Sequence, residues 1–214
     1  MNKTTVASLR LSYNQNELLE ENVLPNPFQQ FEKWFEEALS AQILEPNAMH
    51  LATVSGGKPH GRIVLLKGFD ERGFTFFSNY TSNKGQEIAE NEYIALTFFW
   101  GDLERQIRIE GRIEKVSSQE SDDYHNVRPR GSQIGAWVSN QSKVIDGRKP
   151  LEDSLLAYEK RFENVELIPR PPHWGGYRVI PNSIEFWQGR PNRLHDRILY
   201  SKSKNDWKIE RLSP

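Results

Sequence analysis

The sequence predicts a mainly β protein in which one barrel of six to eight strands has helices packed outside it. Short apolar stretches separated by tight turns, several of them with glycine, run from Met49 to Val116. Similar stretches return between Trp174 and Leu212. Such a succession of short strands is typical of antiparallel meanders that form a barrel or a sandwich. The 214 residues are enough for one substantial domain, or at most two small ones.

The N-terminal region predicts an arm followed by a helix. Residues 1–25 are polar and are expected to form a mobile arm, and residues 26–214 are expected to form a single domain. Asn26 before Pro27 favours a helix start, because asparagine caps free N–H groups and proline fits the first turn. The helix is expected to end at about Gln42 and to face the core with one stripe: Phe28, Phe31, Trp34, Phe35 and Leu39.

Five strands are expected next, at Met49–Ser55, Arg62–Phe69, Phe74–Ser78, Tyr93–Trp100 and Glu104–Val116. In the last of them apolar and polar residues alternate. One face holds Ile107, Ile109 and Ile113, and the other holds Gln106, Arg108, Glu110 and Arg112. This period of two predicts a strand with one face in the core.

Two helices and four strands complete the expected order. Ser117 and Glu120 form a Ser-x-x-Glu capping box, which opens a helix to about Val127. A further helix is expected over Leu151–Phe162, before a proline-rich stretch. The remaining strands are expected at Trp174–Ile180, Ser183–Gln188, Arg197–Ser201 and Trp207–Leu212.

The composition excludes several classes of chemistry. The chain has 28 Lys and Arg residues and 29 Asp and Glu residues, which gives a net charge of -1. It therefore lacks the basic excess that drives nonspecific nucleic-acid binding. The lack of cysteine excludes disulfides, thiolate nucleophiles and iron–sulfur clusters, and the five scattered histidines predict no metal site. No apolar run is long enough to span a membrane, and the N-terminus has no secretory pattern, so we expect a soluble cytoplasmic protein.

Common phosphate-binding loops and the Gly-x-Ser-x-Gly motif are also absent. The remaining candidates are cationic and aromatic side chains in three clusters. The first is Arg62–Lys67, followed by Lys84. The terminal cations of this segment are expected on opposite faces of a strand, and a cation beside hydroxyls and free amides is suited to a phosphate. Taken alone, a barrel strand with solvated ends is the favoured interpretation.

The second cluster is Tyr124–Ser139, in which Arg128, Arg130 and Ser132 lie where a helix is expected to give way to a Pro/Gly loop. An Arg–Ser pair on a loop can bind an anionic oxygen. A solvent-exposed basic turn explains the pattern equally well.

The third cluster, Glu185–Arg197, is the most informative, because its arginines and its histidine are costly to place in a core. Arg193, His195 and Arg197 are expected to follow one strand-like face and to bind an aromatic, anionic ligand. An ion-pair network with Glu185 and Asp196 is the structural alternative, but the density of cations favours binding. Together the clusters fit two phosphorylated, flat molecules, one a substrate and the other a cofactor such as a flavin.

These stretches resemble the pyridoxine/pyridoxamine 5'-phosphate oxidase family over nearly the whole chain. The matching motifs follow one another in order: Leu9-Arg10 with Tyr13, Arg62–Lys67, Leu103–Gln106, Arg128–Arg130 with Ser132–Trp137, Phe186–Gly189, Arg193–Arg197 and Trp207–Pro214. Several long motifs in this order make the resemblance specific. The chain departs from it at Asn83, where the family usually has arginine, and in the arm sequence Arg10–Tyr13.

The resemblance implies an FMN-binding split β-barrel that works as a homodimer, with two active sites at the subunit interface. The FMN contacts that it implies are Arg62, Ile63, Val64, Leu65, Leu66, Lys67, Phe77, Ser78, Lys84, Gln106, Gln141, Ser142, Trp187 and Arg197. The substrate contacts that it implies are Arg10, Tyr13, Lys67, Tyr124, Arg128, Ser132, Arg193, Leu194 and His195. Of these, Arg193 and His195 are expected to orient the substrate for catalysis.

The implied activity is the oxidation of pyridoxine 5'-phosphate and pyridoxamine 5'-phosphate by O2 to pyridoxal 5'-phosphate. Hydrogen peroxide is released, together with ammonia from the amine, in vitamin B6 cofactor biosynthesis and salvage. Two other functions stay open. A split-barrel flavoprotein with another substrate would share the barrel, although the segments Arg128–Ser132 and Arg193–His195 argue against it. A nucleic-acid-binding barrel would also interleave cations with aromatics, but the net charge argues against it.

Overall fold

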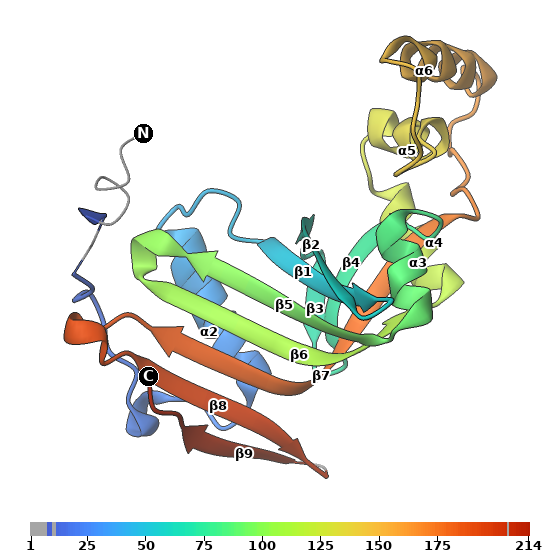
Figure 1. Cartoon of the computed structure of the whole chain (residues 1–214). Helices are drawn as coiled ribbons and strands as arrows, with labels where there is room; N and C mark the ends of the chain where they lie inside the picture. The colour runs from blue at the N-terminus through green and yellow to red at the C-terminus, as the bar shows by residue number, and fades with distance from the viewer. Residues whose placement is uncertain (1–7, 10–11, 205) are drawn as a thin grey trace. The chain divides into compact units, whose positions relative to one another are not determined.

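The structure of the chain is a computed structural model, which describes residues 8–9, 12–204 and 206–214 (Figure 1). Its nine strands are β1 (Ala48–Ser55), β2 (Lys58–Leu65), β3 (Gly68–Asp70), β4 (Gly73–Asn79), β5 (Tyr93–Trp100), β6 (Arg105–Lys115), β7 (Trp174–Gln188), β8 (Asp196–Ser203) and β9 (Asp206–Arg211). The strands pair in the order β2-β1-β5-β6-β7-β4-β3, and β8 pairs with both β7 and β9. The mainly β class predicted from the sequence is confirmed, with nine strands where six to eight were expected.

Within the described residues, five helices and three short 3-10 turns accompany the strands. The helices are α2 (Pro27–Ser40), α3 (Asn83–Glu90), α4 (Ser118–Asn126), α5 (Arg130–Val138) and α6 (Lys149–Arg161). The turns are η1 (Glu20–Asn22), η2 (Gly101–Leu103) and η3 (Pro191–Arg193). None of the helices in the described part of the chain is long and apolar enough to cross a membrane.

The chain divides into two compact units. Unit 1 takes in the described part of residues 1–50 together with Leu96–Glu110 and Pro181–Pro214, and unit 2 takes in Leu51–Ala95 and Gly111–Ile180. Each unit has its own buried aromatic side chains and its own hollow lined by candidate residues. The two are therefore described separately.

The core of unit 1 is built on the aromatic stripe of α2. The side chain of Asn26 accepts a hydrogen bond from the backbone N–H of Phe28, which confirms the predicted helix start. The buried ring of Phe31 lies 5.3 Å from that of Phe98, and the Trp34 ring lies 5.2 Å from that of Phe186. Leu39, expected on the same stripe, is 54% exposed instead, because Ala38 takes the inward position in the last turn.

Unit 2 holds the strand pairs that carry the first half of the candidate site. The segment Arg62–Phe69, expected as one strand, is two strands, and Lys67 lies between their ends. The β4 strand pairs with β7 from Phe74↔Val179 to Asn79↔Trp174. On β7, Gly176 has no side chain, and a Cβ there would lie 2.8 Å from the ring of Phe77. This glycine therefore leaves room for the Phe77 ring over the strand.

Strand β7 is continuous where two strands were expected, at Trp174–Ile180 and Ser183–Gln188. Its first part, Trp174–Val179, pairs with β4, and its last part, Ser183–Gln188, pairs with β8. Pro181 falls where the strand changes partner, and a proline is tolerated in a strand where no N–H has to join a ladder. The expectation of two separate strands is therefore wrong.

Helices α3 and α5 were not expected. Ser82 caps α3 by accepting a hydrogen bond from the backbone N–H of Gly85. In α5 the glycines Gly131 and Gly135 weaken the helical pattern, but Gln133, Ile134 and Ala136 are buried along one side. Packing of that side outweighs propensity, so Arg130 and Ser132 lie on a helix and not on the expected Pro/Gly loop.

Candidate functional site

A hollow of about 460 Å³ in unit 2 brings together most of the residues expected there. We call it the α5 hollow. It is lined by Ile63, Val64, Leu65, Lys67, Phe77, Ser78, Lys84, Tyr124, Arg128, Pro129, Ser132, Gln141 and Trp174. Eight of the expected FMN contacts and four of the expected substrate contacts are in this set, Lys67 being in both. Among the expected residues of unit 2, the lining does not include Arg62, Leu66 and Ser142.

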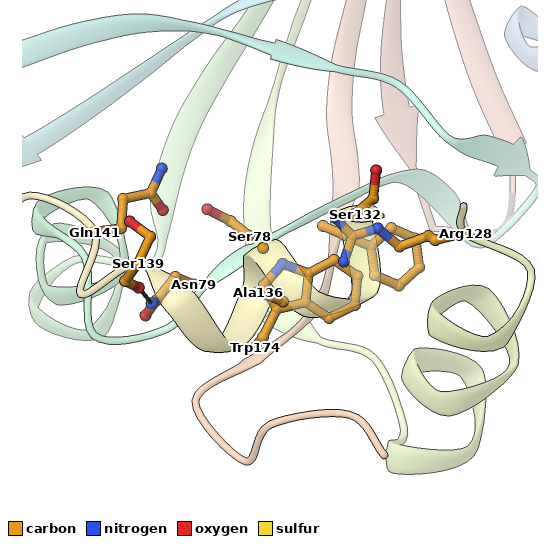
Figure 2. Close-up of a pocket in the computed structure, with 10 residues that line it drawn as sticks. Ser78, Asn79, Arg128, Ser132, Ala136, Ser139, Gln141 and Trp174 are labelled. Carbon is orange, nitrogen blue, oxygen red and sulfur yellow. Dashed lines mark hydrogen bonds between the residues drawn. The ribbon is translucent and has the colours of Figure 1, made fainter. Parts of the chain in front are cut away.

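A second hollow, of about 270 Å³, shares six of these residues and adds Asn79, Gly135, Ala136 and Ser139 (Figure 2). The Asn79 side chain donates a hydrogen bond to the backbone oxygen of Ser139 over 3.5 Å. These four residues were not expected as contacts, although Gly135, Ala136 and Ser139 lie within the second cluster. Their small and polar side chains give no chemical signal, and only the packing of α5 beside β4 reveals them.

Three parallel rings form the floor beside Arg128. The Phe77 ring stacks on the Tyr124 ring with centroids 3.9 Å apart, and its centroid lies 5.5 Å from that of Trp174. The guanidinium carbon of Arg128 lies 4.4 Å from the centroid of the Trp174 ring, and Figure 2 draws both side chains. A guanidinium over an indole face is held by a cation–π interaction. Trp174 is therefore a site residue that the sequence analysis treated only as part of a strand.

Arg128 has an unused hydrogen-bond donor. Its Nη1 is buried and has no hydrogen-bond partner among the described residues. Burial lowers the pKa of Arg128 from its ordinary value, but an arginine keeps its charge at neutral pH. A buried, charged donor without a partner is costly, so an anionic ligand at this position relieves the cost. Ser132, in the first turn of α5, supplies a hydroxyl to the same hollow.

Arg130, two residues further on, has a different role. Its terminal nitrogens donate hydrogen bonds to the backbone oxygens of Val165 (2.8 Å) and Phe162 (2.5 Å). These contacts tie α5 to the segment that follows α6. Arg128 therefore lines the hollow, whereas Arg130 stabilises the packing of α5.

Two further candidate cations of unit 2, Arg62 and Lys84, come from β2 and α3. Lys84 lies with its Nζ 3.3 Å from Oε1 of Gln141. Burial, and next the positive charge of Arg62, lower the pKa of Lys84, while the Glu87 carboxylate opposes them. Arg62 lies on β2 and binds Glu87. Arg62 and Lys84 are thus electrostatically coupled.

Unit 1 has its own hollow, of about 730 Å³, which we call the η3 hollow. It is lined by Leu9, Ser12, Tyr13, Arg190, Asn192, Arg193 and His195. Tyr13, Arg193 and His195 were expected from the sequence, while Leu194 is exposed and is not part of the lining. Arg10 lies outside the described residues.

The prediction that Arg193 and His195 share one face of a strand is wrong. Arg193 ends η3, and His195 precedes β8. Asn192 and Arg193 have φ values of 58° and 63°, in the left-handed region that few side chains adopt. These two residues break the alternation of a strand, yet they leave both Arg193 and His195 on the η3 hollow.

Aromatic contacts and one hydrogen bond hold the His195 ring. Its centroid lies 4.6 Å from that of Trp187 and 5.9 Å from that of Tyr13. The backbone N–H of Arg190 donates to Nδ1 of His195 over 3.1 Å. Burial lowers the pKa of His195, the charge of Arg193 lowers it further, and Asp196 opposes them. The neutral ring therefore carries its proton on Nε2.

Other expected contacts of unit 1 lie in ion pairs or on strands. Arg197 donates to both carboxylate oxygens of Glu185, over 2.7 and 3.1 Å, and the pKa of Arg197 is raised by that hydrogen bond. Nε of Arg190 lies 3.7 Å from Oδ2 of Asp196, so these two side chains also form an ion pair. The ion-pair network considered from the sequence is therefore present for these two arginines. Gln106 is half-buried on β6.

Comparisons with known proteins identify the family. Residues 35–161 match the family model described as pyridoxamine 5'-phosphate oxidase. Residues 174–214 match the pyridoxine 5'-phosphate oxidase C-terminal dimerisation region, which supports the expected homodimer. A curated protein of Nostoc punctiforme, named pyridoxine/pyridoxamine 5'-phosphate oxidase, is 61% identical over 98% of this chain and 99% of its own length. One of Burkholderia ambifaria with the same name is 58% identical over 99% and 100%.

Solved structures agree on the fold. PhzG from Burkholderia lata, solved with tetrahydrophenazine-1-carboxylic acid, matches with a TM-score of 0.86 and 30% identity, over 93% of this chain and 98% of its own. A pyridoxamine 5'-phosphate oxidase-related, FMN binding protein from Nostoc punctiforme has a TM-score of 0.71 at 16% identity, over 90% and 100% of the two chains. The split-barrel fold, the oxidase class and the flavoprotein class expected from the motifs agree with these findings. The chain belongs to the pyridoxine/pyridoxamine 5'-phosphate oxidase family of enzymes.

Proposed function

We propose that the chain is an FMN-dependent oxidase that makes pyridoxal 5'-phosphate. The alcohol reacts as pyridoxine 5'-phosphate + O2 → pyridoxal 5'-phosphate + H2O2. The amine reacts as pyridoxamine 5'-phosphate + O2 + H2O → pyridoxal 5'-phosphate + NH3 + H2O2. The observation that carries the proposal is the buried, unpartnered Nη1 of Arg128, held over Trp174 beside the Ser132 hydroxyl. This set of donors is suited to the phosphate group that both substrates share.

The residues of unit 2 fit FMN by their chemistry. Lys84 lines the α5 hollow and supplies positive charge for its phosphate, Arg62 adds positive charge from outside the lining, and the hydroxyl of Ser78 adds a donor. Ile63, Val64 and Leu65 present an apolar strand to the hollow, which suits a flat ring system. When bound, FMN supplies the acceptor for the two electrons and the hydrogen that leave the substrate carbon, and oxygen takes them up afterwards.

His195 acts as a hydrogen-bond donor in this proposal. Its Nδ1 is occupied by the N–H of Arg190, so Nε2–H is the group that the ring offers to a substrate oxygen or nitrogen. Arg193, exposed on the same hollow, offers a planar set of donors beside it. Together they orient the pyridine ring, while the phosphate acts as the handle that limits the motion of the reacting carbon.

A flat tricyclic carboxylic acid is the second candidate substrate class. PhzG is 30% identical to this chain and was solved with such a molecule. A carboxylate could use the same arginine as a phosphate. The relatives named as pyridoxine/pyridoxamine 5'-phosphate oxidases are 55–61% identical, which favours the vitamin B6 phosphates.

The visible absorption spectrum of the purified protein, reconstituted with FMN and kept anaerobic, tests the proposal. We expect flavin bands that bleach when pyridoxine 5'-phosphate is added and return with air. Pyridoxine without its phosphate is the matched control and should bleach the bands far more slowly. Bleaching by tetrahydrophenazine-1-carboxylic acid alone would favour the second candidate. A protein that binds no FMN would refute both.

A further inference from the structure

Glu87 on α3 forms an ion pair with Arg62 on β2, the arginine that is expected at the FMN phosphate. Glu87 is buried, and its Oε2 accepts hydrogen bonds from Nη2 of Arg62 and from Oγ1 of Thr53, the latter over 2.6 Å. Arg62 Nη1 also donates to Thr53 Oγ1 over 2.6 Å and to the backbone oxygen of Leu51 over 3.3 Å. The three side chains therefore form a closed triangle between β1, β2 and α3.

This triangle fixes the guanidinium of Arg62. Both terminal nitrogens are engaged, and a guanidinium is planar, so two held nitrogens determine the plane and the direction of every other N–H. A free arginine side chain has many rotamers and loses their entropy when it binds a ligand. Holding the side chain in advance lowers that cost, since a preorganised group has less to lose on binding.

Lys84 lies three residues before Glu87 on the same helix, at a spacing that makes them neighbours on the helix surface. Burial lowers the pKa of Lys84 most, the charge of Arg62 lowers it further, and the carboxylate of Glu87 raises it. His60, with Nδ1 3.8 Å from Oε1 of Glu87, is the other titratable group at this carboxylate. Among the described residues, Glu87 is the carboxylate that pairs with Arg62 and also favours the charged form of Lys84, while His60 acts on both Glu87 and Glu90.

We propose that Glu87 is a positioning residue of the FMN phosphate site, because its carboxylate fixes the guanidinium of Arg62 next to the helix that carries Lys84. The inference rests on the proposed binding of FMN by Arg62 and Lys84. Glu87 does not contact FMN itself in this proposal, and acts through Arg62.

The chain offers a matched control on the same helix. Glu90 also links α3 to β1, since it accepts hydrogen bonds from Oγ of Ser55 and, over 2.8 Å, from the backbone N–H of Gly56. It does not take part in the Arg62 triangle. Glu90→Gln therefore weakens the α3–β1 link in a similar way and leaves Arg62 held.

The test is a titration of apoprotein with FMN, followed by the change in flavin fluorescence, at several pH values between about 7 and 10, above the second phosphate ionisation near 6. We expect Glu87→Gln to raise the Kd about tenfold, since a freed arginine costs roughly one rotamer-rich side chain on binding. Glu90→Gln should stay within about a factor of two of the wild type. As the pH rises, Glu87→Gln should also begin to lose FMN affinity at a lower pH than the wild type does, because Lys84 has lost the carboxylate that favours its charged form.

Two further variants keep the test decisive if Glu87→Gln does not fold. Glu87→Asp keeps the negative charge, so its FMN affinity should decline at the same alkaline pH as that of the wild type. Its Kd should lie between those of the wild type and Glu87→Gln. Thr53→Val removes the hydroxyl shared by Glu87 and Arg62 and should weaken binding about threefold. If these variants and Glu87→Gln bind FMN like Glu90→Gln, with the same pH profile, the positioning role is wrong. If the wild type binds no FMN, the proposed function fails instead.

Discussion

The backbone N–H of Arg190 donates a hydrogen bond to Nδ1 of His195, and this contact determines which form of the ring the η3 hollow can use. Only a neutral imidazole can accept at Nδ1. A protonated ring would place two N–H groups against each other at this point. The lowered pKa of His195 favours the neutral ring, and the contact at Nδ1 selects the tautomer with the proton on Nε2.

The pH dependence of the reaction should report His195. Burial and the charge of Arg193 lower its pKa from 6.5, so the ring stays neutral at pH 7 and becomes protonated only in more acid solution. We expect kcat/KM to fall on the acid side with an apparent pKa below 6.5. His195→Asn should lower kcat/KM about tenfold and remove this limb. An acid limb that is unchanged in the variant would assign the titration to another group.

Arg128 and Arg130 should respond to mutation in opposite ways. Arg128→Ala should lower kcat/KM about a hundredfold with the fold retained, because it removes the buried donor beside Ser132. Arg128→Lys should recover little, since an ammonium cannot stack on Trp174 as a guanidinium does. Arg130→Ala should lower the Tm and leave kcat/KM nearly unchanged. Normal activity in Arg128→Ala would overturn its assignment, and so would an unfolded protein.

Lys84→Met should weaken FMN retention. The substitution removes a cation from the α5 hollow and keeps much of the side-chain volume. A charge-assisted hydrogen bond to a phosphate contributes about 1.5–3 kcal/mol, so the Kd for FMN should rise at least about tenfold. Equilibrium dialysis of the holoenzyme measures this directly. Retention equal to that of the wild type would remove Lys84 from the phosphate site.

His125 should make stability depend on pH. Its side chain is fully buried beside Trp174, with neither ring nitrogen hydrogen-bonded among the described residues. Burial, then Arg128 and Arg170, lower its pKa, while Asp122 and the backbone of Gln133 oppose them. As the pH falls below about 6.5, the unfolded chain binds the proton first, so the free energy of unfolding decreases until the lowered folded pKa is reached.

His125→Phe tests this, because it fills the site without a titratable group. Chemical denaturation at pH 5 and pH 8 should show a smaller difference in the variant than in the wild type. One proton accounts for at most about 1.4 kcal/mol per pH unit. An equal pH dependence in both proteins would show that His125 titrates normally in the folded state.

Gly189→Ala should displace Tyr13. A Cβ at Gly189 would lie 2.7 Å from Cγ of Tyr13 and 3.0 Å from Cβ of Glu104, which is closer than real side chains pack. We expect KM to rise several-fold, because Tyr13 lines the η3 hollow with His195. Gly68→Ala is the control, since its Cβ would meet nothing within 4 Å. If both variants keep the wild-type KM, Tyr13 does not contribute to substrate binding.

Elements with strong local signals could be predicted closely. Asn26 before Pro27 placed the start of α2, and the box formed by Ser117 and Glu120 placed that of α4. The alternation of Ile107 and Ile109 with their polar neighbours matches the buried face of β6. In each case the signal depends on residues within one or two turns or along one strand.

Elements without such signals could not be predicted. Helix α5 contains two glycines and forms because Ile134 and Ala136 pack inward. The turn η3 depends on left-handed residues that look ordinary in the sequence, Asn192 and Arg193. Two strands were predicted on either side of Pro181, but β7 runs through that position, where it changes partner from β4 to β8 and a proline is tolerated.

The sequence by itself determined the fold class, the order of most elements, the family and the residue types of the site. These follow from local patterns and from long motifs, both of which are written along the chain. Only the tertiary structure decided which residues work together. Trp174 lies under Arg128, Glu87 holds Arg62, and Arg190 sets the tautomer of His195. The first two contacts join residues that are far apart in the chain, and the third joins two residues across a turn that has no sequence signal. Hydrogen bonds and stacking act over a few ångströms of space, so only the folded chain brings such partners within reach.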